Sequence, residues 1–211
     1  MKMGKKTFFL IFSVLFVVLF GCSVTDRQPA SPDTQNEQSI ADYMPLSEGN
    51  YWAYEGIGNE YASYTAKVTY QQDNKYQVMI DNGGSVTANR YEVTDSTLIN
   101  TYRQSELYDD KNILNSPENY HAVLLQSPLT LGNSWESEGA TYEIADTMAT
   151  ITVPAGTFEN CLVVKIDYND SGNTSYFYYK KGVGLIKTRY VMPGFDDIVS
   201  QLNTYSVRSN P

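Results

Sequence analysis

The 211-residue chain has little of the chemistry that most metal centres and many active sites use. It contains one histidine, His121, and two cysteines, Cys22 and Cys161. A single histidine excludes histidine-based zinc sites, and two cysteines cannot form a cysteine cluster or a disulfide framework. His121 also lacks the Gly-x-Ser-x-Gly context of a hydrolase triad. We therefore predict no metal, no cofactor and no catalytic residue of these kinds.

Positive charge is scarce as well. The chain carries 15 Lys and Arg against 24 Asp and Glu, a net charge of −9. Three of those lysines and none of the acids lie in the first 21 residues, so the remainder has a net charge of −12. Nucleic-acid-binding proteins need a basic footprint. We predict no nucleic-acid partner, and no direct adsorption to anionic lipid.

A long apolar run is also missing. The one candidate covers residues 8–20, which is 13 residues interrupted only by a serine. A membrane-spanning helix needs about 20 residues. Lys2, Lys5 and Lys6 precede the run, and a basic start before a short apolar stretch is typical of a secretory signal peptide. We predict a signal peptide over residues 1–21.

The end of this run resembles the lipobox of bacterial lipoproteins. The residues are Leu19-Phe20-Gly21-Cys22, with Phe20 bulkier than the usual occupant of its position. The resemblance implies cleavage before Cys22, a diacylglyceryl group on its sulfur, incorporation of palmitate, and attachment to a membrane outside the cytoplasm. Whether that is the cell membrane or an outer membrane depends on the kind of bacterium.

Composition then divides the rest of the chain into two parts. Residues 23–41 are polar, contain two prolines and have no aromatic side chain. Such a segment cannot bury enough apolar surface to offset its chain entropy. We assign residues 22–42 to the lipidated cysteine and a flexible tether, and residues 43–211 to a single β-rich domain.

This domain is rich in tyrosine, valine and threonine, which favour strands, and its apolar residues alternate with a period of two. No stretch shows a sustained period of 3.6. We predict an all-β fold, either an antiparallel meander, a sandwich or an open half-barrel. The expected strands are 63–70, 75–80, 90–93, 97–102, 140–153, 159–168, 174–180, 184–191 and 201–207, with an irregular segment at 104–121.

One pattern occurs twice. Residues 45–52 and 128–135 share the form Pro-Leu-x-x-Gly-Asn-x-Trp, 83 residues apart. Two related halves would produce this echo, and so would a chance likeness of two turns. In either case we expect Trp52 and Trp135 to be core anchors, because large aromatic side chains dominate core burial.

The C-terminal half carries two more motifs. They are Val153-Pro-Ala-Gly-Thr-Phe158 and Tyr178-Tyr-Lys-Lys-Gly-Val-Gly-Leu-Ile-Lys187. With the opening motif, they resemble uncharacterised secreted bacterial β-proteins and lipoproteins with a PAGTF turn and a GVGLVK-like strand. The resemblance implies an all-β or half-barrel fold and no activity. We expect Pro154 and Gly156 to form a tight hairpin turn, and Gly182 and Gly184 to permit a bulge or a close backbone approach.

Carboxylates are the remaining candidates for chemistry. Asp109–Asp110 and Asp196–Asp197 are adjacent pairs, but neighbouring residues on a strand point to opposite faces. The segment 167–173 offers several oxygen ligands, yet it lacks the glycine and glutamate of a calcium loop, and a hairpin turn is favoured. Cys161 lies in an apolar strand, which favours a buried, inert thiol.

We therefore hypothesise a membrane-anchored lipoprotein outside the cytoplasm that is not an enzyme and binds an apolar ligand or an envelope partner. The alternatives are an accessory lipoprotein with no small ligand, and a carboxylate-based enzyme acting on glycans. Tyrosine is abundant, with 18 in the chain. Tyr176–Tyr179 place aromatics on both faces of one strand, which a sheet explains as well as a ligand groove does.

Overall fold

The computed structural model describes residues 39–208, which fold into one antiparallel sheet of twelve strands with almost no helix. The all-β prediction is thus confirmed. The strands are β1 (Tyr51–Ile57), β2 (Tyr64–Gln72), β3 (Lys75–Asp81), β4 (Val86–Val93), β5 (Thr97–Ser105), β6 (Ala122–Gln126), β7 (Ser134–Ser137), β8 (Ala140–Val153), β9 (Gly156–Tyr168), β10 (Thr174–Lys180), β11 (Gly184–Val191) and β12 (Ile198–Ser206).

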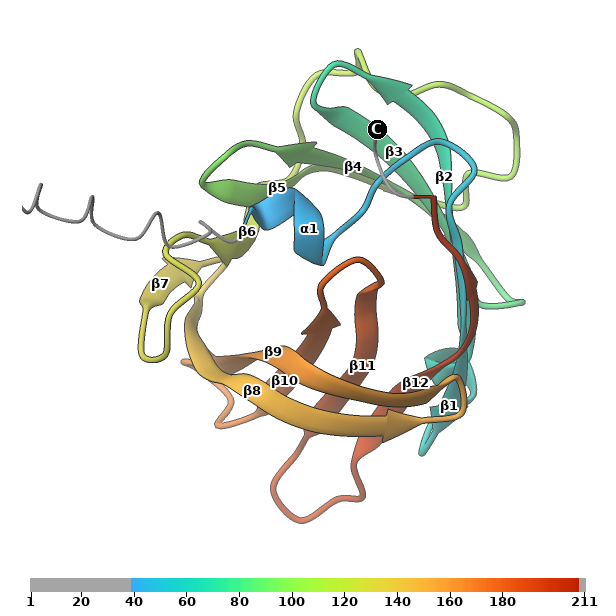
Figure 1. The fold of residues 1–211 in the computed structure, drawn as a ribbon. Helices are drawn as coiled ribbons and strands as arrows, with labels where there is room; N and C mark the ends of the chain where they lie inside the picture. The colour runs from blue at the N-terminus through green and yellow to red at the C-terminus, as the bar shows by residue number, and fades with distance from the viewer. Residues whose placement is uncertain (1–38, 209–211) are drawn as a thin grey trace, which may run out of the picture. The chain divides into compact units, whose positions relative to one another are not determined.

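The sheet consists of two six-stranded meanders. β1 to β6 lie side by side in chain order, β7 to β12 do the same, and the two halves join where β1 pairs with β12. The sheet curls until β6 and β7 meet, so these residues form a nearly closed, barrel-like ring (Figure 1). Of the arrangements that the sequence left open, the structure adopts the meander, closed further than a half-barrel.

The repeated motif marks the start of each half. The turns at 45–52 and 128–135 lead into β1 and β7, the first strand of each meander. In both turns the shared glycine has a positive φ, 89° and 82°. In each turn the glycine N–H donates to the carbonyl of one residue, and the N–H of that same residue donates to the asparagine carbonyl, at 2.8–2.9 Å. The residue is Val68 on β2 for the first turn and Ile144 on β8 for the second. The repeated sequence motif therefore forms the same turn twice, and each half of the sheet begins in the same way.

Side chains, rather than a backbone ladder, join the two free strands of this ring. Asn133 Nδ2 donates to the Gln126 carbonyl at 3.0 Å, and Trp135 Nε1 donates to the Val123 carbonyl at 2.9 Å. Val123 N donates in turn to Ser137 Oγ at 2.8 Å. The contacts run in antiparallel order along β6 and β7. We call this line of contacts the seam.

A one-turn helix closes one end of the ring. The helix α1 (Ile40–Tyr43) lies within the opening in Figure 1, beside β5 and β6, with Ile40 and Tyr43 buried. Gly182 N, in the β10–β11 turn, donates to the Asp42 carbonyl at 2.7 Å, and the neighbouring Lys181 pairs with the Asp42 carboxylate at 2.9 Å. These contacts bind α1 to the second half.

The folded part begins earlier than the sequence predicts. We placed the end of the tether at residue 42, but Ile40 is fully buried in the same core cluster as Trp52. A single isoleucine in a polar segment gives no periodic signal, so composition alone could not locate this start. Cys22 lies outside the described residues, as do the signal peptide and the tether up to residue 38, and these stay predictions.

The glycine motif of the C-terminal half packs against the first tryptophan. Trp52 Nε1 donates to the Val183 carbonyl at 2.7 Å. Gly184 has a φ of 103°, and a Cβ there would lie 3.4 Å from Trp52 Nε1. The predicted close approach is confirmed, and its reason is the indole ring. The PAGTF turn is confirmed too, because Val153 pairs with Gly156 across a two-residue hairpin.

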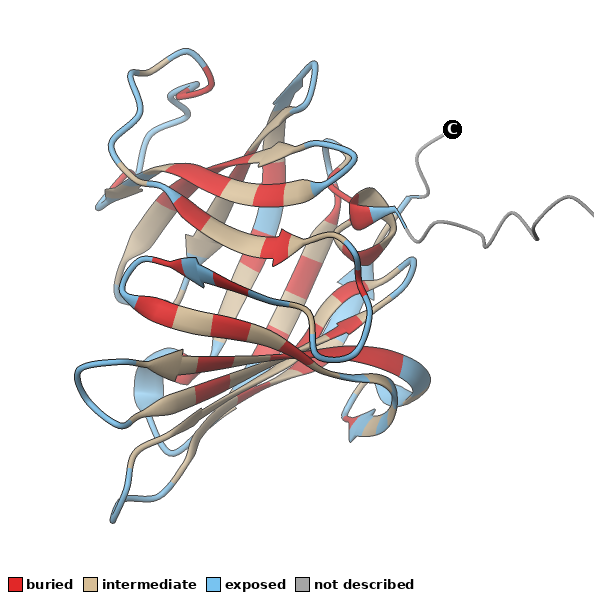
Figure 2. Cartoon of the chain, turned by 90° about the vertical axis from the view of Figure 1, so that its left-hand side faces the viewer, coloured by how far each residue is buried: buried red, intermediate tan, exposed pale blue. Residues whose placement is uncertain are grey.

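The ends of the ring differ. Residues 45–50 connect α1 to β1, so β1 starts at the α1 end and each later strand reverses direction. The opposite end, which we call the mouth, is formed by the β3–β4 loop (82–85), the end of β5 and the 3-10 segment η1 (Glu60–Ala62). Figure 2 shows buried and less buried residues alternating along the strands, with exposed residues gathered in the turns.

The irregular segment predicted at 104–121 is confirmed as a long loop, residues 106–121, between β5 and β6. It lies against the outer face of the sheet, where Leu107 and Ile113 pack with Ala88. Arg90, only 2% exposed, donates from Nη1 to the carbonyls of Leu114 and Ser116 at 3.2 and 2.6 Å. The loop is thus pinned by a buried arginine.

Within residues 39–208, no helix is long and apolar enough to cross a membrane.

Candidate functional site

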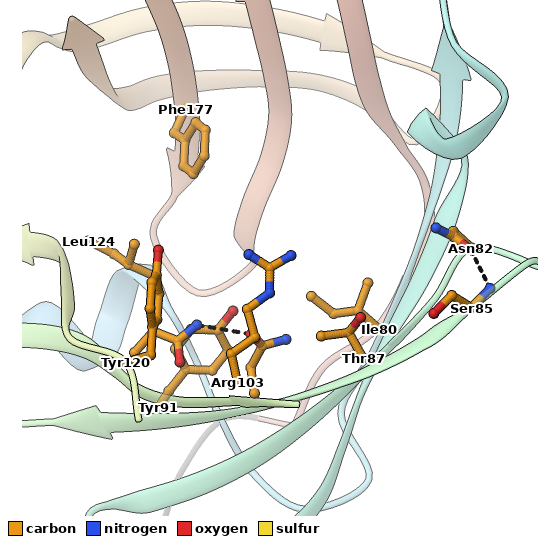
Figure 3. A pocket seen from close by; sticks show the side chains of 11 residues that line it. Ile80, Asn82, Ser85, Thr87, Tyr91, Arg103, Tyr120, Leu124 and Phe177 are labelled. Atoms are coloured by element: carbon orange, nitrogen blue, oxygen red, sulfur yellow. Dashed lines mark hydrogen bonds between the residues drawn. The ribbon is translucent and has the colours of Figure 1, made fainter. Parts of the chain in front are cut away.

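A cavity of about 310 Å³ lies inside the ring, between β3–β6 and β10. This volume is at the lower end of the range for small-molecule sites. Figure 3 shows Tyr91, Arg103 and Tyr120 projecting from one side toward Phe177 on the other. The lining residues are Ile80, Asn82, Ser85, Thr87, Asn89, Tyr91, Asn100, Arg103, Tyr120, Leu124 and Phe177.

A bulge in β5 places two of these side chains on the same inner face. The register between β4 and β5 shifts between Arg90 and Tyr91, so Thr101 is the extra residue on β5. Asn100 and Arg103 are three positions apart and would point to opposite faces of a regular strand. The bulge turns both into the cavity, as bulges beside binding sites commonly do.

An asparagine pair forms part of the cavity wall. Asn100 Nδ2 donates to Asn89 Oδ1 at 2.9 Å, and both residues are buried, at 6% and 4% exposure. The other polar atom of Asn100, Oδ1, has no hydrogen-bond partner among the described residues. An unpaired buried polar atom costs about 1–3 kcal/mol. A donor group that reached Asn100 Oδ1 would relieve this cost.

Arg103 supplies the only formal charge in the cavity lining. It lies directly opposite Asn89 in the β4–β5 ladder. None of the ion pairs between residues 39 and 208 includes Arg103, in contrast to Arg90 and Arg189. No Asp or Glu lines the cavity, although Glu138 acts on the Tyr120 hydroxyl from outside the lining.

Tyrosine hydroxyls complete the polar part of the site. Burial raises the pKa of Tyr91 to about 12, although the nearby Arg103 guanidinium acts in the opposite direction. Burial also raises the pKa of Tyr120, as does Glu138, while Arg103 again lowers it. Both hydroxyls therefore stay protonated at neutral pH, and they can donate or accept a hydrogen bond.

The acidic pairs singled out from the sequence lie elsewhere. Asp110 is in the outer loop, where its Oδ1 accepts a bond from the Tyr70 hydroxyl at 2.8 Å, and Asp109 beside it is exposed. Asp197 is bonded to Arg189 at 2.6 Å in the β11–β12 loop, where Asp196 is exposed. The structure brings neither pair to the cavity.

The structure confirms three other sequence-based expectations: the hairpin turn within 167–173, the buried Cys161 and the two core tryptophans. Residues 167–173 include the β9–β10 hairpin turn. Cys161 is a free, buried thiol whose pKa is raised, chiefly by burial, which suits an inert side chain. Trp52 and Trp135 are core residues. Among residues 39–208, no group of three or more His, Cys, Asp or Glu side chains could hold a metal ion. His121 is exposed.

The aromatic strand 176–179 has two roles. Tyr179 is buried in the core, and the outer rings of Tyr176 and Tyr178 lie beneath Arg189 and Lys187 at 5.8 and 5.7 Å. Packing within and on the sheet therefore accounts for these three tyrosines without a ligand. Phe177, by contrast, lines the cavity.

Sequence reasoning missed Asn89, Asn100 and Arg103. One signal for two of them was present, because asparagine is depleted in strands, yet Asn89 and Asn100 both lie within strand-like stretches. The bulge that aligns Asn100 with Arg103 left no such signal, since it arises from the pairing of β5 with β4.

Comparison with known proteins gives little further information. No family model and no curated protein matches the chain. Two solved structures resemble it, each over 78% of this chain and 98% of its own, at 14% identity. One, from Bacteroides fragilis, is provisionally assigned as an exported protein with a YmcC-like fold (TM-score 0.45); the other, from Parabacteroides distasonis, provisionally as a lipoprotein (TM-score 0.40). Both scores are too low to support an argument about this chain.

Proposed function

We propose that this chain is an exported lipoprotein whose β domain holds a small ligand with an apolar part inside the sheet. The observation that carries the binding role is the cavity, which combines aromatic and aliphatic walls with the unpaired Asn100 and Arg103. The proposal assigns no catalytic residue. The acids that a glycan-active enzyme would need are absent from the cavity lining, which favours binding over catalysis.

The anchor rests on the sequence around Cys22. Each buried methylene contributes about 0.8 kcal/mol, and a single acyl chain holds a protein only marginally, so stable attachment needs two. A diacylglyceryl group supplies two. Its position before a polar segment of about 17 residues would leave the β domain free in the aqueous phase.

Labelled palmitate fed to the native host tests the anchor. Wild-type protein should incorporate the label and stay with the membrane fraction, whereas Cys22→Ala should do neither. Cys161→Ala is the matched control, because it removes the only other cysteine, which is buried, and should leave labelling unchanged. Equal labelling of wild type and Cys22→Ala would contradict the lipoprotein assignment.

Native mass spectrometry of the full-length protein, purified from its host envelope in mild detergent, tests the ligand. We expect a small adduct that is released on unfolding. Leu124→Trp, which fills part of the cavity, should remove the adduct. Leu131→Trp is the control, since Leu131 is 70% exposed in the β6–β7 loop, at the far end from the mouth. An adduct that survives Leu124→Trp would place the ligand elsewhere.

A second candidate is an accessory role with no small ligand. Three large apolar side chains are exposed at the mouth end: Ile57 at 56%, Tyr61 at 58% and Phe195 at 74%. Exposed apolar patches commonly mark contacts with other proteins. Wild-type protein that gives only its bare mass would favour this role, with cross-linking in cells as the direct measurement.

A further inference from the structure

We propose that the ligand of this cavity is a small carboxylate that also bears a hydroxyl or N–H group, with Arg103 binding its charge and Asn100 accepting its proton donor. This inference rests on the proposed function and gives it a ligand class. It depends on two observations in the cavity wall, one electrostatic and one a matter of hydrogen bonding.

The electrostatic observation is that Arg103 is a cation without a carboxylate partner. Two other described arginines already have partners. Arg90 pairs with Glu92 and donates to the outer loop, and Arg189 pairs with Asp197. Guanidinium presents several N–H donors in a planar fork that matches a carboxylate. The Arg103 side chain points into the cavity among neutral residues, so an incoming anion meets no fixed acid there (Figure 3).

The charge of the cavity limits the charge of the ligand. One arginine can neutralise one negative charge. A dianion such as a phosphate monoester would carry one charge that no lining side chain pairs, although Arg103 is itself exposed to solvent at the mouth. A monoanionic carboxylate fits this balance better.

The hydrogen-bonding observation is Asn100 Oδ1. Its residue is 94% buried, it lines the cavity, and its other amide atom is already bonded to Asn89. The oxygen itself has no partner among residues 39–208. A site with a buried, unpaired acceptor favours a ligand that donates to it and discriminates against one that cannot. The ligand therefore needs an O–H or N–H group in addition to its charge.

The remaining walls determine the body of the ligand. Tyr91 and Tyr120 on one side and Phe177 on the other present rings to the same space, with Leu124 beside Tyr120 and Ile80 on the other side of Arg103. A flat or short aliphatic body fits between such rings, and about 310 Å³ suits a small molecule better than an oligosaccharide. Small amphiphilic hydroxy or amino acids and their aromatic relatives have this combination of features.

Isothermal titration of the full-length protein with three related compounds tests the proposal. The probes are para-hydroxyphenylpropionate, its neutral amide, and phenylpropionate, which lacks the hydroxyl. Relative to the first probe, we expect binding to weaken about tenfold for the amide and about tenfold for phenylpropionate, as the loss of one charged or one buried hydrogen bond implies. The ratio of the affinity for the anionic probe to that for its amide should decrease as salt is added.

Two substitutions assign these preferences to their residues. Arg103→Gln should abolish the preference for the anion over the amide while leaving the affinity for the amide unchanged. Arg208→Gln makes the same change in charge on an exposed residue at the α1 end and should have no effect. Asn100→Leu should remove the difference in affinity between the hydroxylated probe and phenylpropionate.

The outcomes separate this inference from the function on which it rests. If the anion and the amide bind wild type equally well, the ligand is not selected by charge and the inference is wrong, although a binding cavity remains. If no probe binds at millimolar concentration and no adduct accompanies the native protein, both the inference and the binding function are wrong. A preference for the anion that persists in Arg103→Gln would assign the charge to another residue and overturn the role of Arg103.

Discussion

Replacing Trp52 with alanine is expected to lower the free energy of unfolding by about 3–5 kcal/mol, the usual cost of deleting a large buried aromatic side chain. The indole is 2% exposed and its Nε1 donates to the Val183 carbonyl at 2.7 Å. It thereby joins the first strand of one half to the β10–β11 turn of the other. Urea denaturation followed by circular dichroism measures the change.

Trp52→Phe separates the two contributions. The phenyl ring keeps most of the buried area but leaves the Val183 carbonyl without its donor, so we expect a smaller loss of about 1–3 kcal/mol. Leu131→Trp and Leu131→Ala, at an exposed site, should change stability by less than about 0.5 kcal/mol. If Trp52→Ala proved as stable as wild type, Trp52 would not be the anchor that the structure shows.

Replacing Arg90 with alanine should cost a similar amount, about 3–5 kcal/mol, because removal of one partner leaves buried groups unpaired. Arg90 Nε donates to Thr101 Oγ1 at 2.7 Å and lies 3.3 Å from Glu92 Oε1, while its Nη1 holds the outer loop. In the variant we also expect faster hydrogen exchange in residues 106–121, measured by mass spectrometry.

Arg90→Lys and Arg103→Gln are informative comparisons. Lysine keeps the charge but not the planar fork of donors, so Arg90→Lys should fall between wild type and Arg90→Ala. Arg103→Gln should leave stability nearly unchanged, since Arg103 is exposed at the mouth and has no ion pair among the described residues. Because Tyr120 lies at the end of the loop and lines the cavity, Arg90→Ala should also weaken ligand binding.

Local pattern was enough to predict most of the sheet. Alternation located β2, β3, β5 and the five strands from β8 to β12 to within a few residues. The repeated Pro-Leu-x-x-Gly-Asn-x-Trp motif left two related halves and a chance likeness open, and the structure favours related halves because the glycine and asparagine make the same bonds in both turns. β6 escaped detection: Ala122–Gln126 is short, and its apolar residues do not alternate.

The joining of the two halves and the cavity could not be predicted in the same way. Both depend on residues far apart in the sequence, such as Trp52 with Val183, or Arg103 with Phe177. No local period encodes those distances. The buried arginine is a further example, because Arg90 resembles an ordinary polar strand residue until loop residues 106–121 cover it.

Among the described strands, the seam is the one junction of the ring that no strand ladder holds. Eleven strand pairs are held by main-chain hydrogen bonds, whereas β6 and β7 depend on Asn133, Trp135 and Ser137. Leu124 lies on β6 beside this line and also lines the cavity. Under the proposed binding role, we expect substitutions of Asn133, Trp135 and Ser137 to change which molecules the interior accepts, while the eleven strand ladders stay in place.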